Sequence, residues 1–596
     1  MTVDLRPSPD WWKSAVVYQI YPRSFMDSDG DGIGDLPGIT SRLDHLQALG
    51  VDVLWLSPVY RSPMDDNGYD ISDYDDVDPL FGTLDDLDEL IASCHDRGIR
   101  VVLDLVVNHT SDEHPWFVES RDPASPRRDW YWWRPPRSGH DPGKPGAEPT
   151  NWESVFSGSA WEYDDSSGEY FLHIFSRKQP DLNWENPEVR EAVYAMMRRW
   201  VDRGVDGFRM DVINLISKDP TLPELPVPDG RRYGPISQAV ANGPRLHEFL
   251  QEMNREVGLS ERHLLTVGEM PGSTVDLARE VTDPRRKEVS MVFTFEHVGL
   301  DEQPGLGKWA LADLPLPVLK ENLATWQRGL AAVGWNSLYW DNHDQPRAVS
   351  RFGDDSPEHR VNSAKTLATV LHLHKGTPYI YQGEELGMTN AGFTSIEQYR
   401  DIESLNHVID ARSRGLDCEA ASASLAAKSR DNARTPMQWD GSEHGGFTTG
   451  EPWLPVNANS ITINAVAEVR YPGSVFHHYR RLIELRHTHP VVVHGRFELL
   501  LPDDEQVWAF TRSLDDQVVV VVANCSSRGV AVDTATLPDL AAARLLLATH
   551  GDRTSLSTLQ PWESRIYLVT RGRAAAPDEG RATDGRQPTS SVRADD

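Results

Sequence analysis

Residues 207–212 read GFRMDV, and this short stretch is the best single guide to how the chain folds. An apolar run of the kind found in buried strands ends on a carboxylate, Asp211, at the point where the run stops. Residues 266–269 (TVGE) and 340–345 (WDNHDQ) repeat the arrangement and supply Glu269 and Asp344. Three strand-like runs that each end on an acidic residue indicate parallel strands with functional groups gathered at one rim.

Outward from these motifs, strand-like runs alternate with helix-periodic segments such as 84–97, 187–203 and 361–374. The eight strands are predicted at residues 16–20, 53–56, 101–106, 205–210, 264–267, 289–295, 337–340 and 378–381. Eight strand–helix repeats predict an α/β fold, a (β/α)8 TIM barrel whose functional face is the rim at the strand C-termini.

Two interruptions and a change of pattern divide the chain. Residues 1–109 and 179–490 form the predicted barrel, and residues 110–178, rich in Trp, Pro, Gly and Ser, form a small domain inserted after the third strand. A polar insertion at about 389–439 follows the eighth strand. In residues 491–571 apolar and polar side chains alternate, as they do in strands. This pattern predicts a C-terminal all-β sandwich domain, followed by a disordered tail at 572–596.

The charge balance limits the partners. The 596 residues include 91 acidic and 59 basic side chains, a formal net charge of −32, which argues against nucleic acid and anionic membrane as partners. Three scattered cysteines, Cys94, Cys418 and Cys525, provide neither a disulfide framework nor metal-ligand spacing. No signal-like or eighteen-residue apolar segment occurs, so we expect a cytoplasmic protein, and the oligomeric state stays open.

The three acidic motifs suggest a division of chemical roles. Arg209 and Asp211 point the same way in a strand, and a guanidinium favours the ionised carboxylate that a nucleophile requires. Glu269, emerging into a partly apolar pocket, suits a general acid. Taken singly, these motifs could be a structural ion pair and a helix-capping carboxylate. Together with Asp344 beside His343, they favour glycosidic-bond chemistry, which needs one acid and one carboxylate.

Polar residues also follow other strands. Asp104, Asn108 and His109 end the third strand, and residues 66–70 (DNGYD) follow the second, where Tyr69 offers a ring face. His109 alone would more often be a structural histidine. Polar clusters after so many successive strands indicate a substrate site at the rim.

An acidic, glycine-rich loop follows the first strand. Its four aspartates occupy positions one, three, five and nine of an EF-hand-like pattern, but position twelve is Gly38 rather than glutamate. We therefore predict a structural calcium or magnesium site that is not an EF-hand, with a solvated acidic turn as the alternative. No organic cofactor is predicted.

Longer motifs carry a family resemblance. Residues 18–25 (YQIYPRSF), 104–109 (DLVVNH), 179–184 (QPDLNW), 266–272 (TVGEMPG) and 430–439 (RDNARTPMQW) resemble the α-amylase superfamily. The most similar branch is that of oligo-1,6-glucosidases, dextran glucosidases and α-glucosidases, and the resemblance extends to about Thr570.

The resemblance implies roles for individual residues. Asp211 would be the nucleophile, Glu269 the general acid/base and Asp344 the third carboxylate, with Asp211 and Glu269 about 5 Å apart as retention requires. The glucose subsite would be lined by His109, Arg209 and His343, closed at its far end by Asp66 and Arg430, and floored by Tyr69, while Phe175 and Gln179 would contact the incoming linkage. The implied metal ligands are Asp27, Asp29, Asp31, Ile33 through its carbonyl, and Asp35.

The implied activity is that of a retaining exo-α-glucosidase acting on short α-gluco-oligosaccharides. Valine after the nucleophile accompanies α-1,6 cleavage in this branch, so Val212 favours α-1,6-linked substrates. Residues 299–302 (GLDE) lack the arginines of sucrose isomerases. The alternatives are a trehalose-6-phosphate hydrolase, an α-1,4-preferring α-glucosidase or transglucosidase, and, remotely, a catalytically silent binding subunit, although the full carboxylate triad is present.

Overall fold

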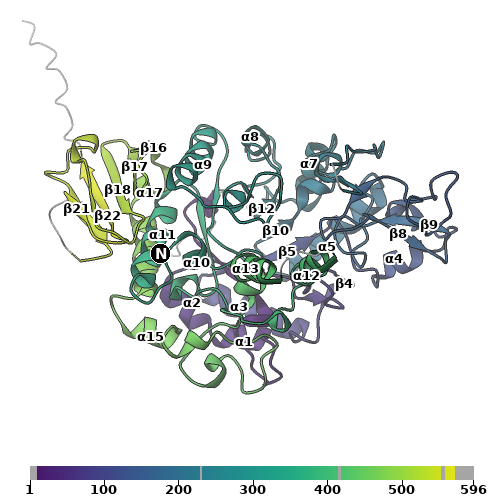
Figure 1. Cartoon of the computed structure of the whole chain (residues 1–596), viewed down its shortest axis with the longest axis horizontal. Coiled ribbons are helices and arrows are strands. Elements are labelled where there is room, and N and C mark those ends of the chain that lie inside the picture. The colour runs from purple at the N-terminus through teal and green to yellow at the C-terminus, as the bar shows by residue number, and fades with distance from the viewer. Residues whose placement is uncertain (1–9, 229–230, 414–417, 552–556, 571–596) are drawn as a thin grey trace, which may run out of the picture.

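A computed structural model describes residues 10–228, 231–413, 418–551 and 557–570 (Figure 1). The predicted disordered tail at 572–596 lies outside the described residues. Among those described, no helix has the length and apolar character needed to cross a bilayer.

The centre of the molecule is an eight-stranded parallel sheet rolled into a barrel. Its strands are β1 (Val17–Ile20), β2 (Val53–Leu56), β5 (Arg100–Val106), β10 (Gly207–Asp211), β12 (Leu265–Glu269), β13 (Met291–Phe293), β14 (Ser337–Leu338) and β15 (Thr377–Tyr381). They are ordered β13-β12-β10-β5-β2-β1-β15-β14. A parallel bridge between Val292 and Asn336 and a 2.6 Å hydrogen bond from Ser337 Oγ to the Val292 carbonyl join the two ends. The barrel is therefore nearly closed, as the strand–helix alternation predicts.

The sixth and seventh strands are shorter than predicted from residues 289–295 and 337–340. In β14 only Ser337 and Leu338 pair with their neighbour. Trp340 has left the sheet and is fully buried, with its ring centroid 5.1 Å from that of Phe352. The aromatic run belongs to the packing between strand and helix rather than to the ladder.

Helices surround the barrel, and α3 (Leu84–Asp96), α5 (Pro187–Arg203) and α11 (Arg360–Leu373) lie within two residues of their predicted bounds. Helix α5 shows why. Asn186 caps its first turn by accepting from the Glu188 N–H, Pro187 occupies the first position, and Gly204 ends it in the left-handed region. Its buried face includes Val189, Val193 and Met197 at helical spacing.

The segment after β5 forms a separate set of elements at the right of Figure 1. They are α4 (Pro115–Ser120), the three-stranded sheet β6 (Trp133–Arg134), β9 (Glu169–Leu172) and β8 (Trp161–Asp164), and β7 (Trp152–Glu153). Strand β7 pairs with β11 (Gly234–Pro235) from the loop after β10, so the insertion is joined directly to that loop. Trp132, Trp152, Trp161 and Leu172 share one apolar cluster with residues of the β10 loop.

The polar insertion after β15 contains helices α12 (Ile402–Ser413), α13 (Cys418–Lys428) and α14 (Asp431–Arg434). Tyr399, Val408 and Leu425 are buried in one small cluster that fixes this hairpin of helices. The short helix α14 follows Arg430.

The C-terminal region is antiparallel, with five strands in the order β16-β17-β18-β22-β20. Their bounds are β16 (Arg496–Leu500), β17 (Val507–Leu514), β18 (Gln517–Asn524), β20 (Arg544–Ala548) and β22 (Ser564–Thr570), and a second layer pairs β19 (Val530–Ala531) with β21 (Thr558–Leu559). The strands do not begin at residue 491 as expected, because Pro490–His494 form helix α17. Pro490 starts that helix, and packing of Val491 and Val492 into the barrel core overrides the extended preference of three consecutive valines.

Candidate active site

The carboxylates of Asp211 and Glu269 lie side by side at the barrel rim. Each is the last residue of its strand, β10 or β12, and these strands are neighbours. Met210 pairs with Gly268, so the next residue of each strand reaches the rim at the same level. Asp344 arrives from the loop that follows β14.

One buried guanidinium connects three acidic side chains. Arg209 Nη1 lies 2.5 Å from Asp211 Oδ1 and 2.8 Å from Asp104 Oδ1. Its Nη2 lies 2.6 Å from Glu269 Oε2. Asp104 pairs in register with Arg209, so it lies within β5 rather than at the strand end where the sequence pattern placed it. Alternation along the strand brings Arg209 and Asp211 to the same face, as predicted.

Burial raises the proton affinities of both rim carboxyls. It raises the pKa of Glu269 to about 7, although Arg209 opposes the rise, and the neighbouring Asp211 adds to it. Burial also raises the pKa of Asp211, to about 6, with Arg209 again opposing. Glu269 therefore holds a proton more strongly than Asp211, which is the order needed for an acid beside a nucleophile.

Asp344 is held as an anion. His343 Nε2 lies 3.0 Å from its Oδ2, and Arg430 Nη1 and Arg434 Nη2 lie 3.2 and 2.7 Å from its Oδ1. Burial alone would raise the pKa of Asp344, but His343 and the two arginines hold it well below its usual range. Gln19 Nε2 lies 2.8 Å from His343 Nδ1 and fixes the imidazole from behind.

An ion pair lies at the other end of this cluster. Arg430 Nη2 is 3.2 Å from Asp66 Oδ1, and Gln179 Nε2 donates to Asp66 Oδ2 at 3.1 Å. The same Gln179 amide lies 3.2 Å from His109 Nε2. Gln179 is almost fully buried, and its amide contacts Asp66 and His109. It therefore positions these two side chains, in addition to the predicted contact with the incoming linkage.

Aromatic rings complete the lining. The ring of Tyr69 stacks on His343 with centroids 5.1 Å apart and planes 7° apart, and its hydroxyl donates to Asp104 Oδ2. Phe175 lies 5.2 Å from the His109 ring and 5.7 Å from the Phe156 ring. Val212, directly after Asp211, is buried among apolar side chains of the insertion. The structure thus brings all twelve predicted catalytic and substrate-binding residues into one connected cluster.

Sequence reasoning missed Asp401 and Arg434. Asp401 Oδ2 lies 2.8 Å from Arg430 Nη2 and 2.8 Å from Arg434 Nη1, and the Asp401 side chain is not exposed. This anion orients both arginines toward Asp344. Arg434 follows Arg430 by one helical turn, which could have indicated that the two share a target. Asp401 lies in a polar segment that carries no such signal.

The acidic loop after β1 gathers three of its four predicted carboxylates. Oxygen atoms of Asp27, Asp29 and Asp35 lie within 4.8 Å of one another, whereas Asp31 is outside this group. Asp31 Oδ1 instead accepts the backbone N–H of Ile33 at 2.8 Å. Asp35 also caps helix α1 (Leu36–Ser41) by accepting from Gly38 N–H.

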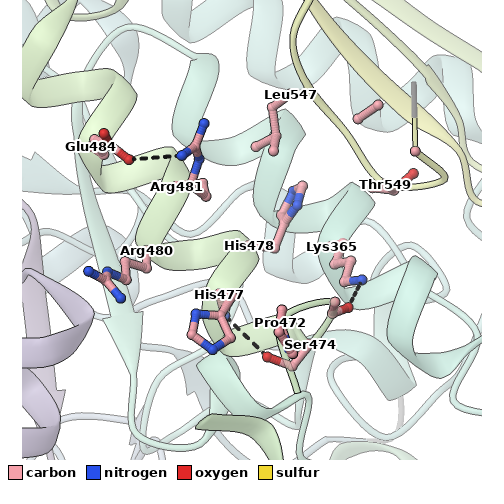
Figure 2. Close-up of a pocket in the computed structure, with 13 residues that line it drawn as sticks. Lys365, Pro472, Ser474, His477, His478, Arg480, Arg481, Glu484, Leu547 and Thr549 are labelled. Atoms are coloured by element: carbon pink, nitrogen blue, oxygen red, sulfur yellow. Dashed lines mark hydrogen bonds and ion pairs between the residues drawn. The ribbon is translucent and has the colours of Figure 1, made fainter. Parts of the chain in front are cut away.

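A hollow of about 600 Å³ lies elsewhere, between α11, α16 (Val475–Thr488) and β20 (Figure 2). Lys365, His478, Arg481 and Leu547 are among its lining residues. Lys365 donates to the Gly473 carbonyl and Arg481 pairs with Glu484. None of the three rim carboxylates lines this hollow, so it is separate from the site described here.

Comparison with known proteins agrees with the fold. A model of the alpha amylase catalytic domain matches residues 19–495, so the chain belongs to the alpha-amylase family of glycoside hydrolases. The oligo-1,6-glucosidase of Halalkalibacterium halodurans is 55% identical over 566 residues, which cover 94% of this chain and 99% of that protein. The trehalose-6-phosphate hydrolase of Bacillus subtilis is 50% identical over 570 residues, covering 94% and 98% of the two chains. The crystal structure of Bacillus licheniformis trehalose-6-phosphate hydrolase superposes with a TM-score of 0.87 at 46% identity, over 94% of this chain and all of that one.

Proposed function

We propose that this enzyme is a retaining, exo-acting α-glucosidase that removes terminal α-1,6-linked glucose from short oligosaccharides. The observation that carries the proposal is that Arg209 bridges the carboxylates of Asp211 and Glu269, which end two neighbouring strands of the barrel. The oligo-1,6-glucosidase of H. halodurans, similar over nearly its whole length, supports the same assignment.

The geometry supports a double displacement. Asp211, kept ionised by Arg209, attacks the anomeric carbon while Glu269 protonates the departing glycosidic oxygen. A covalent glucosyl ester on Asp211 results. Glu269, now deprotonated, accepts a proton from the water that cleaves the ester, and glucose leaves with retained configuration. Asp344, ionised throughout, binds sugar hydroxyls and stabilises the positive charge of the transition state.

Exo action follows from the Asp66–Arg430 pair. The pair is anchored on both sides, Asp66 by Gln179 and Arg430 by Asp401. We propose that these fixed charges close the site beyond one terminal sugar, with the Asp66 carboxylate and the Arg430 guanidinium binding its terminal hydroxyls.

Linkage preference rests on Val212, whose side chain is the apolar group next to the nucleophile. Trehalose-6-phosphate hydrolysis is the second candidate because of the 50% identity to the B. subtilis enzyme. A phosphate would need a free cation near the pocket. Lys308 and Arg231 line one hollow beside Phe156, and each pairs with an acidic residue, Lys308 with Glu403 and Arg231 with Glu153. This favours the uncharged oligosaccharide.

We also propose a structural calcium or magnesium ion at the acidic loop. The three gathered carboxylates, Asp27, Asp29 and Asp35, are hard oxygen donors of the kind these ions prefer. Asp31 and the Ile33 carbonyl would complete the predicted set. Chelation should lower the melting temperature, and calcium or magnesium should restore it, with Asp27→Asn insensitive to both. A melting curve unchanged by chelator would argue for a solvated turn. We propose a cytoplasmic location and no organic cofactor.

A substrate panel tests the main proposal. Isomaltose should be cleaved faster than maltose, sucrose or trehalose 6-phosphate, with α-glucose released first. Asp211→Asn should lose several orders of magnitude in kcat/KM on an aryl α-glucoside. Wild-type rates in that variant would refute the assignment of Asp211. Val212→Thr, with its hydroxyl, should move the preference toward α-1,4 linkages, and an unchanged preference would place the determinant elsewhere.

A further inference from the structure

The backbone of Val212 is in the left-handed region, with φ 36° and ψ 41°. A β-branched residue rarely adopts this conformation, because its side chain clashes with the backbone. Val212 is where β10 stops and the short helical turn Ile213–Leu215 begins, and the Leu215 N–H donates to the Val212 carbonyl at 2.8 Å. An unfavourable backbone directly after the nucleophile calls for a functional explanation.

The conformation directs the Val212 N–H at Glu269. The amide nitrogen lies 3.0 Å from Glu269 Oε2. The same oxygen receives Arg209 Nη2 at 2.6 Å. Glu269 Oε2 therefore has two donors, one of them charged, and both come from the β10 segment that carries the nucleophile.

Packing on two sides holds Val212 in place. Its side chain is 8% exposed and belongs to the apolar cluster of the insertion, with Ile174 and Leu215. Ile213, the next residue, is fully buried against β12, where a Cβ on Gly268 would come within 3.0 Å of its Cγ2. The glycine before Glu269 leaves the space that the turn occupies.

We propose that Val212 is a positioning residue for Glu269: its N–H and Arg209 together occupy Oε2, so the transferable proton is carried on Oε1. An oxygen that accepts two N–H donors is the carboxylate-like one, and a protonated hydroxyl oxygen is the poorer acceptor. The turn thereby fixes both the rotation of the carboxyl group and the oxygen that delivers the proton. This inference rests on the proposed role of Glu269 as general acid/base.

The direct test removes only the N–H. Replacing Val212 by its α-hydroxy acid analogue turns the 211–212 amide into an ester and keeps the isopropyl side chain. The Val212 N–H stabilises the ionised form of Glu269, so its loss should raise the pKa of Glu269. The upper limb of the pH profile of kcat/KM should therefore move to higher pH by about one unit. The value of kcat/KM for isomaltose should fall about tenfold or more. A 2,4-dinitrophenyl α-glucoside, whose leaving group needs no protonation, should lose much less.

Three controls separate the possibilities. An ester at Leu215 removes the hydrogen bond within the turn but keeps the Val212 N–H, so its upper limb should match wild type. Val212→Thr keeps the N–H and the branched side chain, so the upper limb of its pH profile should stay at the wild-type position even where its linkage preference changes. Melting temperatures report folding of each variant. A Val212 ester with the wild-type pH profile and wild-type leaving-group dependence overturns the inference. A Glu269→Gln variant that still hydrolyses isomaltose at the wild-type rate would overturn the proposed function instead.

Discussion

The ammonium of Lys218 lies 3.0 Å from Oδ2 of Asp181, and neither side chain is exposed. Lys218 comes from the loop after β10, and Asp181 follows the insertion, whose Ile174 N–H donates to Asp181 Oδ1. The ammonium also donates to Asn108 Oδ1 at 2.9 Å and to the Leu215 carbonyl at 2.8 Å. Asn108 in turn lies 3.2 Å from His109 Nδ1. One buried cation thus connects the β10 loop, through Asp181, with the insertion and, through Asn108, with His109 of the predicted glucose subsite.

Lys218→Met should therefore destabilise the protein by about 3–5 kcal/mol, because it leaves a buried carboxylate without its partner. It should also lower kcat/KM, since Asn108 loses a contact that positions it beside His109. Urea unfolding measures the first effect. Lys178→Met is the matched control, since Lys178 pairs with Asp112 at a partly exposed position and should cost about 1 kcal/mol or less. Equal losses in the two variants would contradict the structural role of Lys218.

The pH dependence of kcat/KM should be a narrow bell with limits near 6 and 7. Below the lower limit Asp211 is protonated and cannot attack, and above the upper limit Glu269 has lost the proton it must donate. Because the two carboxyls interact, the limits belong to the pair. A substrate with an activated leaving group should lose the upper limb only. If isomaltose kept a full rate well above pH 8, Glu269 could not be the acid.

The positions of Asp211 and Glu269 could be predicted because they depend on local pattern. Residues 207–211 and 265–269 each end at a carboxylate, and the register of the two parallel strands brings those ends together. The alternation of Arg209 and Asp211 likewise follows from strand geometry alone.

Other features depend on contacts between distant segments. Asp401 orients Arg430 and Arg434 from a segment without periodicity, and Lys218 matters only after the insertion folds against the β10 loop. Val212 adopts a left-handed backbone, although a β-branched residue favours the extended one. Only packing from the insertion and the donor–acceptor pair with Glu269 explain its turn. Local propensity could not have predicted it.

Opening the closed end of the pocket should weaken exo action. Asp66→Ala combined with Arg430→Ala removes the fixed charges that would bind the terminal hydroxyls, and kcat/KM for isomaltose should fall at least roughly 100-fold. Isomaltotetraose should then release some isomaltose as well as glucose. Asp65→Ala is the control and should behave as wild type. Asp65 is partly exposed, and its ion pair with Lys178 is long, at 3.9 Å. Glucose as the sole first product of the double variant would show that the end is closed by other groups.

A second pair of buried carboxyls, Asp341 and Glu384, lies in mutual contact, and we expect the two groups to share one proton. Glu384 accepts a hydrogen bond from the Tyr479 hydroxyl and contacts Asp341, whose Oδ2 accepts the Ala348 N–H at 2.8 Å. Burial and the neighbouring Asp341 raise the pKa of Glu384 well above its usual range. A folded-state pKa above the unfolded value gives stability that is fully present at low pH and is lost as the pH rises through the folded-state pKa.

Glu384→Gln should remove this loss, because the amide keeps a donor for Asp341 and an acceptor for Tyr479 without ionising. The variant should gain stability relative to wild type as the pH rises from acidic to alkaline, measured as the difference in melting temperature. Glu484→Gln, on an exposed helix face where Glu484 pairs with Arg481, should leave the pH dependence of stability unchanged. If Glu384→Gln and wild type lost stability in parallel, Asp341 and Glu384 would not share a proton in the folded protein.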